Sequence, residues 1–256
     1  MARTDTLANF LTDVANAIRN KTGRTGTISP ANFDIEINSI ITGDEDPEED
    51  VIVLPDGYGV LPRIISSGDQ YIRTGILPTD NTGFEIDFET TDPFEASGNA
   101  RTIFGSRGIN YWKNAYQFST YTTASDGDIG GVFAFGTVAS MSYYASMKYS
   151  AHMSNNKRMT VSFRNPIFTD AEGHSVNIVA NQGIYDSTEI ILFGLNDYGS
   201  YKEFANMTLY RCKFYEGDVL IRDFVPALRT SDLTVGLFDM VNQQFYTNEG
   251  SGSFTY

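Results

Sequence analysis

Three acidic side chains alternate with apolar ones in the segment FEIDFET, residues 84–90. Glu85, Asp87 and Glu89 occupy every second position, so on a pleated strand they emerge from one face. Two carboxylates are the catalytic pair of glycoside hydrolysis, and a retaining mechanism needs them about 5 to 5.5 Å apart. The Cα atoms of Glu85 and Glu89 would lie on the order of 13 Å apart, so their side chains would have to lean together across Asp87. The spacing therefore permits a catalytic pair without requiring one.

The same alternation is typical of a half-buried strand with one wet face. Phe84, Ile86 and Phe88 form the apolar set that would be buried, which forces the acids outward. The chain has one tryptophan, Trp112, whereas a cleft that holds several sugar rings usually stacks them on more than one broad aromatic face. We favour the structural interpretation and expect no enzyme.

The composition excludes several classes of partner. A count of 32 Asp plus Glu against 18 Lys plus Arg leaves a formal charge of -14, which repels nucleic-acid backbones and anionic lipid heads. A single cysteine, Cys212, excludes internal disulfides and a thiolate zinc cluster, and we expect an inert, half-buried thiol. No apolar stretch approaches about 18 residues, and no charged-then-apolar leader is present. We therefore expect no nucleic acid, no membrane, and synthesis in the cytoplasm without a signal peptide.

Two amphipathic helices are predicted within residues 1–42. The first has Thr4 or Asp5 as its N-cap and Gly23 as its stop. The second begins with Ser29 as N-cap and Pro30 at the first helical position. The apolar stripes of the two helices, which we expect to serve assembly, consist of Leu7, Phe10, Leu11, Val14, Ile18, Phe33, Ile37 and Ile40.

This helical hairpin is too short to be stable without tertiary packing. It must dock either onto the rest of the chain or, as we favour, onto a second copy or a larger assembly. The acidic, proline-containing segment GDEDPEED, residues 43–50, reads as a self-repelling linker. We therefore expect the hairpin to anchor the chain or to form a symmetric homo-oligomer such as a trimer.

From residue 51 onward the apolar period changes from helical to alternating, which predicts a mostly β chain folded as an antiparallel β-sandwich. The segment VNQQ, residues 241–244, predicts a hairpin between Leu237-Phe238 and Phe245-Tyr246. In VLIRDFVPALR the pattern predicts a strand that ends at Pro226. Because domain termini often lie close together, we expect the last strand to lie beside the first.

Three segments carry a resemblance to a known family. GDQYIRTGI at residues 68–76, FYEGDVLIRDFVP at 214–226 and VGLFDMVNQQFYTNEGSGSF at 235–254 resemble the opening strand, a late hairpin and the closing strands of the laminin G-like, concanavalin A-like jelly roll. This module occurs in tail- or capsid-associated virion proteins of phages that infect Gram-positive bacteria. The resemblance covers residues 51–256. Separately, LTDVANAIRNKTG resembles helical segments that begin tail-associated proteins of such phages.

The resemblance implies a non-enzymatic virion structural protein, such as a surface-projecting fibre, a decoration protein or a host adhesin. Its N-terminal hairpin would contact other virion proteins, and its jelly roll could bind host cell-wall carbohydrate. The alternative is a glycan depolymerase, because the E-x-D-x-E pattern resembles the core of family 16 glycoside hydrolases, which share the sandwich. Glu85 and Glu89 would then be nucleophile and acid/base, although the following TTDPFEASGN does not match that family's continuation.

The candidate ligand-binding residues lie in a tyrosine-rich region between residues 111 and 149. Tyrosine and tryptophan offer flat faces with a polar edge, which suits sugars or partner proteins, although packing in the core or rim explains most such residues equally well. The candidates are Tyr111, Trp112, Tyr116, Tyr143 and Tyr144. The resemblance also implies a weak calcium site at the rim, formed by Asp126 and Asp128 in SDGDIGG. We expect no other cofactor.

Overall fold

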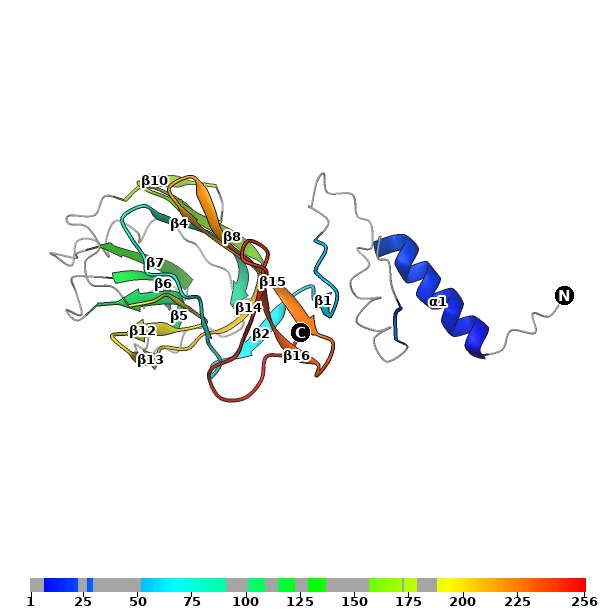
Figure 1. Ribbon diagram of the computed structural model, residues 1–256. Coiled ribbons are helices and arrows are strands. Elements are labelled where there is room, and N and C mark those ends of the chain that lie inside the picture. The colour runs from blue at the N-terminus through cyan, green and yellow to red at the C-terminus, as the bar shows by residue number, and fades with distance from the viewer. Residues whose placement is uncertain are drawn as a thin grey trace.

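The computed structural model describes residues 7–22, 27–29, 52–90, 101–108, 115–122, 129–136, 157–171, 173–178 and 188–256. Within these ranges the chain forms two β-sheets and one α-helix (Figure 1). All strand pairs are antiparallel except that of β12 with β5. The prediction of a mostly β, antiparallel chain is confirmed.

The larger sheet, sheet A, is built around β4 and the long strands β14 and β15. Its strand order is β10-β9-β8-β4-β14-β15-β16-β17, with β1 beside β15 and β2 beside β14. The strands are β1 (Tyr58–Val60), β2 (Ile64–Ser67), β4 (Thr82–Thr90), β8 (Met159–Arg164), β9 (Ile167–Thr169), β10 (Ser175–Asn177), β14 (Asn206–Glu216), β15 (Val219–Arg229), β16 (Thr234–Asp239) and β17 (Gln244–Thr247).

The smaller sheet, sheet B, has the order β13-β12-β5-β11-β3, and β6 joins β5 to β7. Its strands are β3 (Ile72–Arg73), β5 (Arg101–Arg107), β6 (Ala115–Thr122), β7 (Ile129–Gly136), β11 (Ile191–Leu192), β12 (Leu195–Asp197) and β13 (Ser200–Lys202). The two sheets pack face to face over the larger of two hydrophobic clusters (Figure 1).

Phenylalanine rings from both sheets fill this core. The β4 side chains Phe84, Ile86 and Phe88 are fully buried, as their alternation predicts. Phe84 lies edge-on to Phe104 of β5, with 4.8 Å between ring centroids. Phe88 lies edge-on to Phe118 of β6 at 5.8 Å. Such tilted pairs are favoured over face-to-face stacking, and they fix the two sheets against each other.

The first two strands fill a gap between β14 and β15. β14 pairs with β2 near Leu209 and with β15 from Cys212 onward, while β15 passes from β14 to β1. The prediction that β15 ends at Pro226 is wrong, because the strand continues to Arg229. At Pro226, β15 is no longer paired with β14, so the missing N–H of the proline breaks no hydrogen bond to that strand. The Pro226 carbonyl accepts from the Leu61 N–H at 2.9 Å.

The C-terminal part closes the sandwich. β16 and β17 form the predicted hairpin, with Leu237 opposite Tyr246 and Phe238 opposite Phe245. Ile65 of β2 and Thr255 exchange backbone hydrogen bonds of 2.8 and 3.1 Å. The end of the chain therefore lies beside β2, whereas the last strand, β17, pairs with β16 and the first, β1, with β15.

The first predicted helix is confirmed as α1 (Leu7–Thr22). Figure 1 shows α1 apart from the strands of both sheets. Ile18 is buried and Leu11 and Val14 are half-buried, whereas Phe10 is 58% exposed. α1 is too short and too polar to cross a membrane, and no other helix occurs in the described ranges. The second predicted helix, with Phe33, Ile37 and Ile40, and the linker at residues 43–50 lie outside those ranges.

Candidate functional site

The three acids of β4 emerge from the outer face of sheet A, opposite the buried phenylalanines, and each has its own partner. Glu85 accepts a hydrogen bond from Lys213 Nζ at 3.0 Å. Asp87 accepts from Arg158 Nε at 3.0 Å. Glu89 accepts from the Tyr210 hydroxyl at 3.0 Å.

The neighbouring strands explain these partners. β14 places Lys213 opposite Glu85 and Arg211 opposite Asp87. Arg211 itself forms a two-pronged ion pair with Asp223 of β15, at 2.9 and 2.8 Å. Opposite charges on adjacent strands stabilise a sheet, so the outer face of sheet A around β4 and β14 carries a lattice of alternating charges.

Two arginine–tyrosine contacts extend this lattice. The Arg158 guanidinium lies 4.2 Å from the centroid of the Tyr210 ring, and the Arg164 guanidinium lies 3.3 Å from that of Tyr215. Both are within the range of a favourable cation–π contact. Burial, followed by the hydrogen bond to Glu89, raises the pKa of Tyr210, so Tyr210 stays protonated and donates a hydrogen bond to that carboxylate.

The lattice bears directly on the glycosidase alternative. Glu85 and Glu89 could approach one glycosidic bond only by leaning together across Asp87, which Arg158 holds between them. Each glutamate would also have to leave its own donor on β14. These contacts favour the structural interpretation of FEIDFET.

A second polar cluster lies on the outer side of sheet B, where the sequence shows no motif. Gln117 of β6 accepts from Arg107 Nε at 2.7 Å and donates to Thr102 Oγ1 at 2.9 Å. Glu203 accepts from Thr102 Oγ1 at 2.9 Å and lies 3.7 Å from the Arg107 guanidinium. Gly105 makes room for this cluster, because a Cβ there would lie 3.0 Å from the Gln117 side chain.

The cluster on sheet B is mostly closed to solvent. Thr102, Arg107 and Gln117 are buried, and the Glu203 side chain is 19% exposed. Glu203 is also held at φ 54°, in the left-handed region, and its carbonyl accepts from the Thr102 N–H at 2.8 Å. The network thus fastens the segment before β14 onto β5, which is a structural role.

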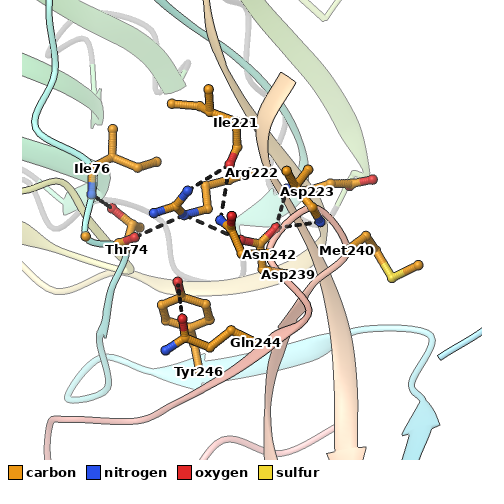
Figure 2. A network of polar contacts seen from close by, with 12 residues as sticks. Thr74, Ile76, Ile221, Arg222, Asp223, Asp239, Met240, Asn242, Gln244 and Tyr246 are labelled. Atoms are coloured by element: carbon orange, nitrogen blue, oxygen red, sulfur yellow. Dashed lines mark hydrogen bonds and ion pairs between the residues drawn. The ribbon is translucent and has the colours of Figure 1, made fainter. Parts of the chain in front are cut away.

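A third network surrounds Asp239, at the end of β16 (Figure 2). Its carboxylate is fully buried and accepts from the backbone N–H groups of Asp223 and Val241, each at 3.0 Å. It also accepts from Asn242 Nδ2 at 2.7 Å. A buried carboxylate is tolerated only when it accepts hydrogen bonds. Here the bonds from Val241 and Asn242 also fix the turn between β16 and β17.

Arg222 supplies the positive charge for Asp239 and reaches sheet B. Its Nε lies 3.4 Å from Asp239 Oδ2 and 3.4 Å from the carbonyl oxygen of Thr74, the residue that follows β3 (Figure 2). The guanidinium also donates to the Ile221 carbonyl at 2.8 Å. Arg222 and Asp239 therefore join one end of sheet A to sheet B.

The structure describes one of the five predicted ligand-binding aromatics. Tyr116 has no exposed surface, and its hydroxyl donates to the Thr82 carbonyl at 2.8 Å. Burial raises the pKa of Tyr116 well above its usual range. Tyr116 is therefore a core residue in this fold and offers no ring face to a ligand. The other candidates, Tyr111, Trp112, Tyr143 and Tyr144, lie outside the described ranges.

The predicted calcium ligands, Asp126 and Asp128, also lie outside the described ranges. Within the part of the chain that is described, no three His, Cys, Asp or Glu side chains are grouped as a metal ion would require. Cys212 is buried, and this burial raises the pKa of its thiol well above the usual value. The thiol was expected to be half-buried but is fully enclosed, and burial of this kind makes a thiol less reactive.

An aromatic stack at the margin of sheet B was not predicted. Tyr71, just before β3, lies between Tyr201 of β13 and Phe204, with ring centroids 4.6 and 5.7 Å away. All three rings are partly exposed. No local spacing connects residues 71 and 201, so only the fold reveals this surface.

No protein-family model and no curated protein sequence matches the chain.

Proposed function

We propose that the protein is a non-catalytic structural component of a phage particle. Its β-sandwich would be a jelly roll of the laminin G-like, concanavalin A-like kind, displayed on the particle and able to touch cell-wall carbohydrate. The observation that carries the non-catalytic part is the separate engagement of the β4 acids by Lys213, Arg158 and Tyr210. The particle itself is inferred from the family resemblance of residues 51–256.

The N-terminal segment supports an attachment role. α1 lies apart from the sheets (Figure 1), and its Phe10 is 58% exposed. An amphipathic helix of this length gains most of its stability from packing its apolar face. We propose that this face contacts other virion proteins or further copies of the chain, with a trimer as the expected oligomer.

The first experiment addresses catalysis. The purified chain and its Glu85→Gln and Glu89→Gln variants are incubated with β-glucans and with Gram-positive cell walls, and new reducing ends are measured. We expect the same background release from all three proteins. Release by the wild-type chain that either substitution abolishes would establish the glycoside hydrolase alternative.

The second experiment addresses the particle. Antibodies against residues 51–256 are used for immunogold labelling of phage particles purified from cells that produce the protein. We expect labelling on intact particles, at a symmetric set of positions. A protein that stays in the soluble lysate while the particles remain unlabelled would overturn the virion assignment.

A further inference from the structure

The aromatic stack of Tyr71, Tyr201 and Phe204 has the shape of a flat binding platform. The Tyr71 and Tyr201 rings are inclined by 25°, and the Tyr71 and Phe204 rings by 16°. Three nearly parallel rings therefore form one slab, in which Tyr71 is the middle layer and Tyr201 is an outer layer. β13, which carries Tyr201, is the last strand on the path of sheet B.

Two glycines make room for this slab. A Cβ on Gly194 would lie 2.7 Å from the Phe204 ring, and a Cβ on Gly250 would lie 3.1 Å from the Tyr71 ring. The inner side of the slab is thus backed by main chain, which holds the rings in place. Tyr71 is also anchored by its backbone N–H, which donates to Asn248 Oδ1 at 3.1 Å.

Charged groups flank the rings. The Arg73 guanidinium is paired with Glu189 and lies 3.8 Å from Glu249, and the Arg73 and Glu249 side chains are both 46% exposed. Burial raises the pKa of Tyr71, and the neighbouring Tyr201 and Glu249 raise it further. Hydrogen-bond donors and acceptors therefore lie beside partly exposed aromatic rings.

This combination has a specific chemical match. A rigid aromatic face with a polar border suits a sugar ring, whose C–H groups lie on the aromatic face while its hydroxyls bond to charged side chains. The formal charge of -14 opposes polyanions such as teichoic acids. The favoured ligand is therefore a glycan without net charge.

We propose that the outer face of Tyr201, supported from behind by Tyr71, is the stacking surface of a binding site for a neutral glycan, with Arg73 and Glu249 as its polar contacts. The inference deepens the proposed function and rests on it, because the sandwich can reach a cell-wall glycan only if it lies on the surface of the particle. It assigns recognition to residues other than the tyrosine-rich region between residues 111 and 149.

The test uses the full chain with Tyr201→Ala and Tyr201→Phe. Tyr198→Ala is the matched control, because Tyr198 is 56% exposed in the adjoining turn but lies outside the stack. Binding to tetra-N-acetylchitotetraose and to laminarihexaose is measured by calorimetry. Binding to Gram-positive cell walls stripped of teichoic acid is measured by co-sedimentation. Circular dichroism and thermal melting verify that each variant folds.

Tyr201→Ala should weaken binding about three- to tenfold, the value of one aromatic contact. Tyr201→Phe and Tyr198→Ala should bind as the wild type does. Equal affinity of wild type and Tyr201→Ala would overturn the site, and so would a wild type that binds none of these glycans. A Tyr201→Ala variant that loses self-association instead would show a contact between copies. Immunogold labelling of particles tests the proposed function and does not depend on the glycan-binding or self-association results.

Discussion

The carboxylates of Asp239 and Glu85 differ in burial. Asp239 is fully buried and depends on Arg222 and on three N–H donors. The Glu85 side chain is 39% exposed and has Lys213 as its partner on a wet face. Breaking a buried pair leaves a charge without compensation, whereas an exposed pair is screened by water. The two sites should therefore respond very differently to substitution.

Asp239→Ala should lower the free energy of unfolding by about 3 to 5 kcal/mol, because three N–H donors and the half-buried Arg222 would lose their acceptor. Lys213→Gln, the control that removes the partner of the exposed Glu85, should cost about 0 to 1 kcal/mol. Urea unfolding followed by circular dichroism measures both. Similar losses for the two variants would show that the ion pair with Asp239 is no more important than a surface pair.

Alkaline pH should destabilise the protein through Cys212. Burial raises the pKa of this thiol in the folded state, so the unfolded chain releases the proton first. The stabilisation is complete below about pH 8.5, the usual thiol value, and is lost as the pH rises above it, by up to about 1.4 kcal/mol per pH unit. Tyr116 adds the same trend above about pH 10.

The measurement is the urea midpoint of wild type and Cys212→Ala from pH 7 to pH 10. The variant should start lower, since it loses buried volume, but should fall less steeply between pH 8.5 and pH 10. Parallel curves for the two proteins would mean that the thiol ionises equally easily in both states.

At the scale of elements, the β16–β17 hairpin depends on one close approach. A Cβ on Gly236 would lie 2.2 Å from the Tyr246 carbonyl oxygen, which is main chain and cannot move aside alone. Gly236→Ala should therefore lower the free energy of unfolding by about 1 to 3 kcal/mol.

Gly105→Ala is the control for this substitution. A Cβ at Gly105 would lie 3.0 to 3.1 Å from side-chain atoms of Gln117 and Leu195, a longer approach than at Gly236 and one to side chains rather than to main chain. Its loss in a denaturant titration should be the smaller of the two. A larger loss at Gly105 would show that the sheet B cluster tolerates less movement than the hairpin does.

Elements with local signals were predictable from the sequence. The alternation in FEIDFET gave the buried and exposed faces of β4, and the VNQQ turn gave the β16–β17 hairpin. The extent of β15 was not predictable, because Pro226 is tolerated only where one neighbouring strand replaces another. That replacement depends on β1, which is far away in the chain.

The candidate site was less predictable than the fold. The outward direction of the β4 acids followed from the pleat, but their partners are separated from them by 71 to 128 positions. The Tyr71–Tyr201 stack has no local pattern at all. Tyr116, in contrast, was named a candidate ligand-binding residue from the sequence, but its side chain faces the core.

At the scale of the whole molecule, the sandwich should fold without the N-terminal segment. Both clusters of its core draw only on residues from position 52 onward. A chain of residues 51–256 should therefore keep the wild-type thermal midpoint. If α1 drives assembly, this fragment should be monomeric in sedimentation, whereas the full chain forms the oligomer. Self-association of the fragment would contradict the proposed role of the N-terminal segment.

The hydrogen bonds between Ile65 and Thr255 constrain how the protein can be engineered. A cargo fused after Tyr256 would emerge on the side of the molecule that carries α1 (Figure 1), where it would crowd the attachment surface. The β14–β15 turn at Gly217 lies at the opposite end of β14 from β2. An insertion in that turn would instead leave from the end of sheet A opposite to β2 and to the C-terminus.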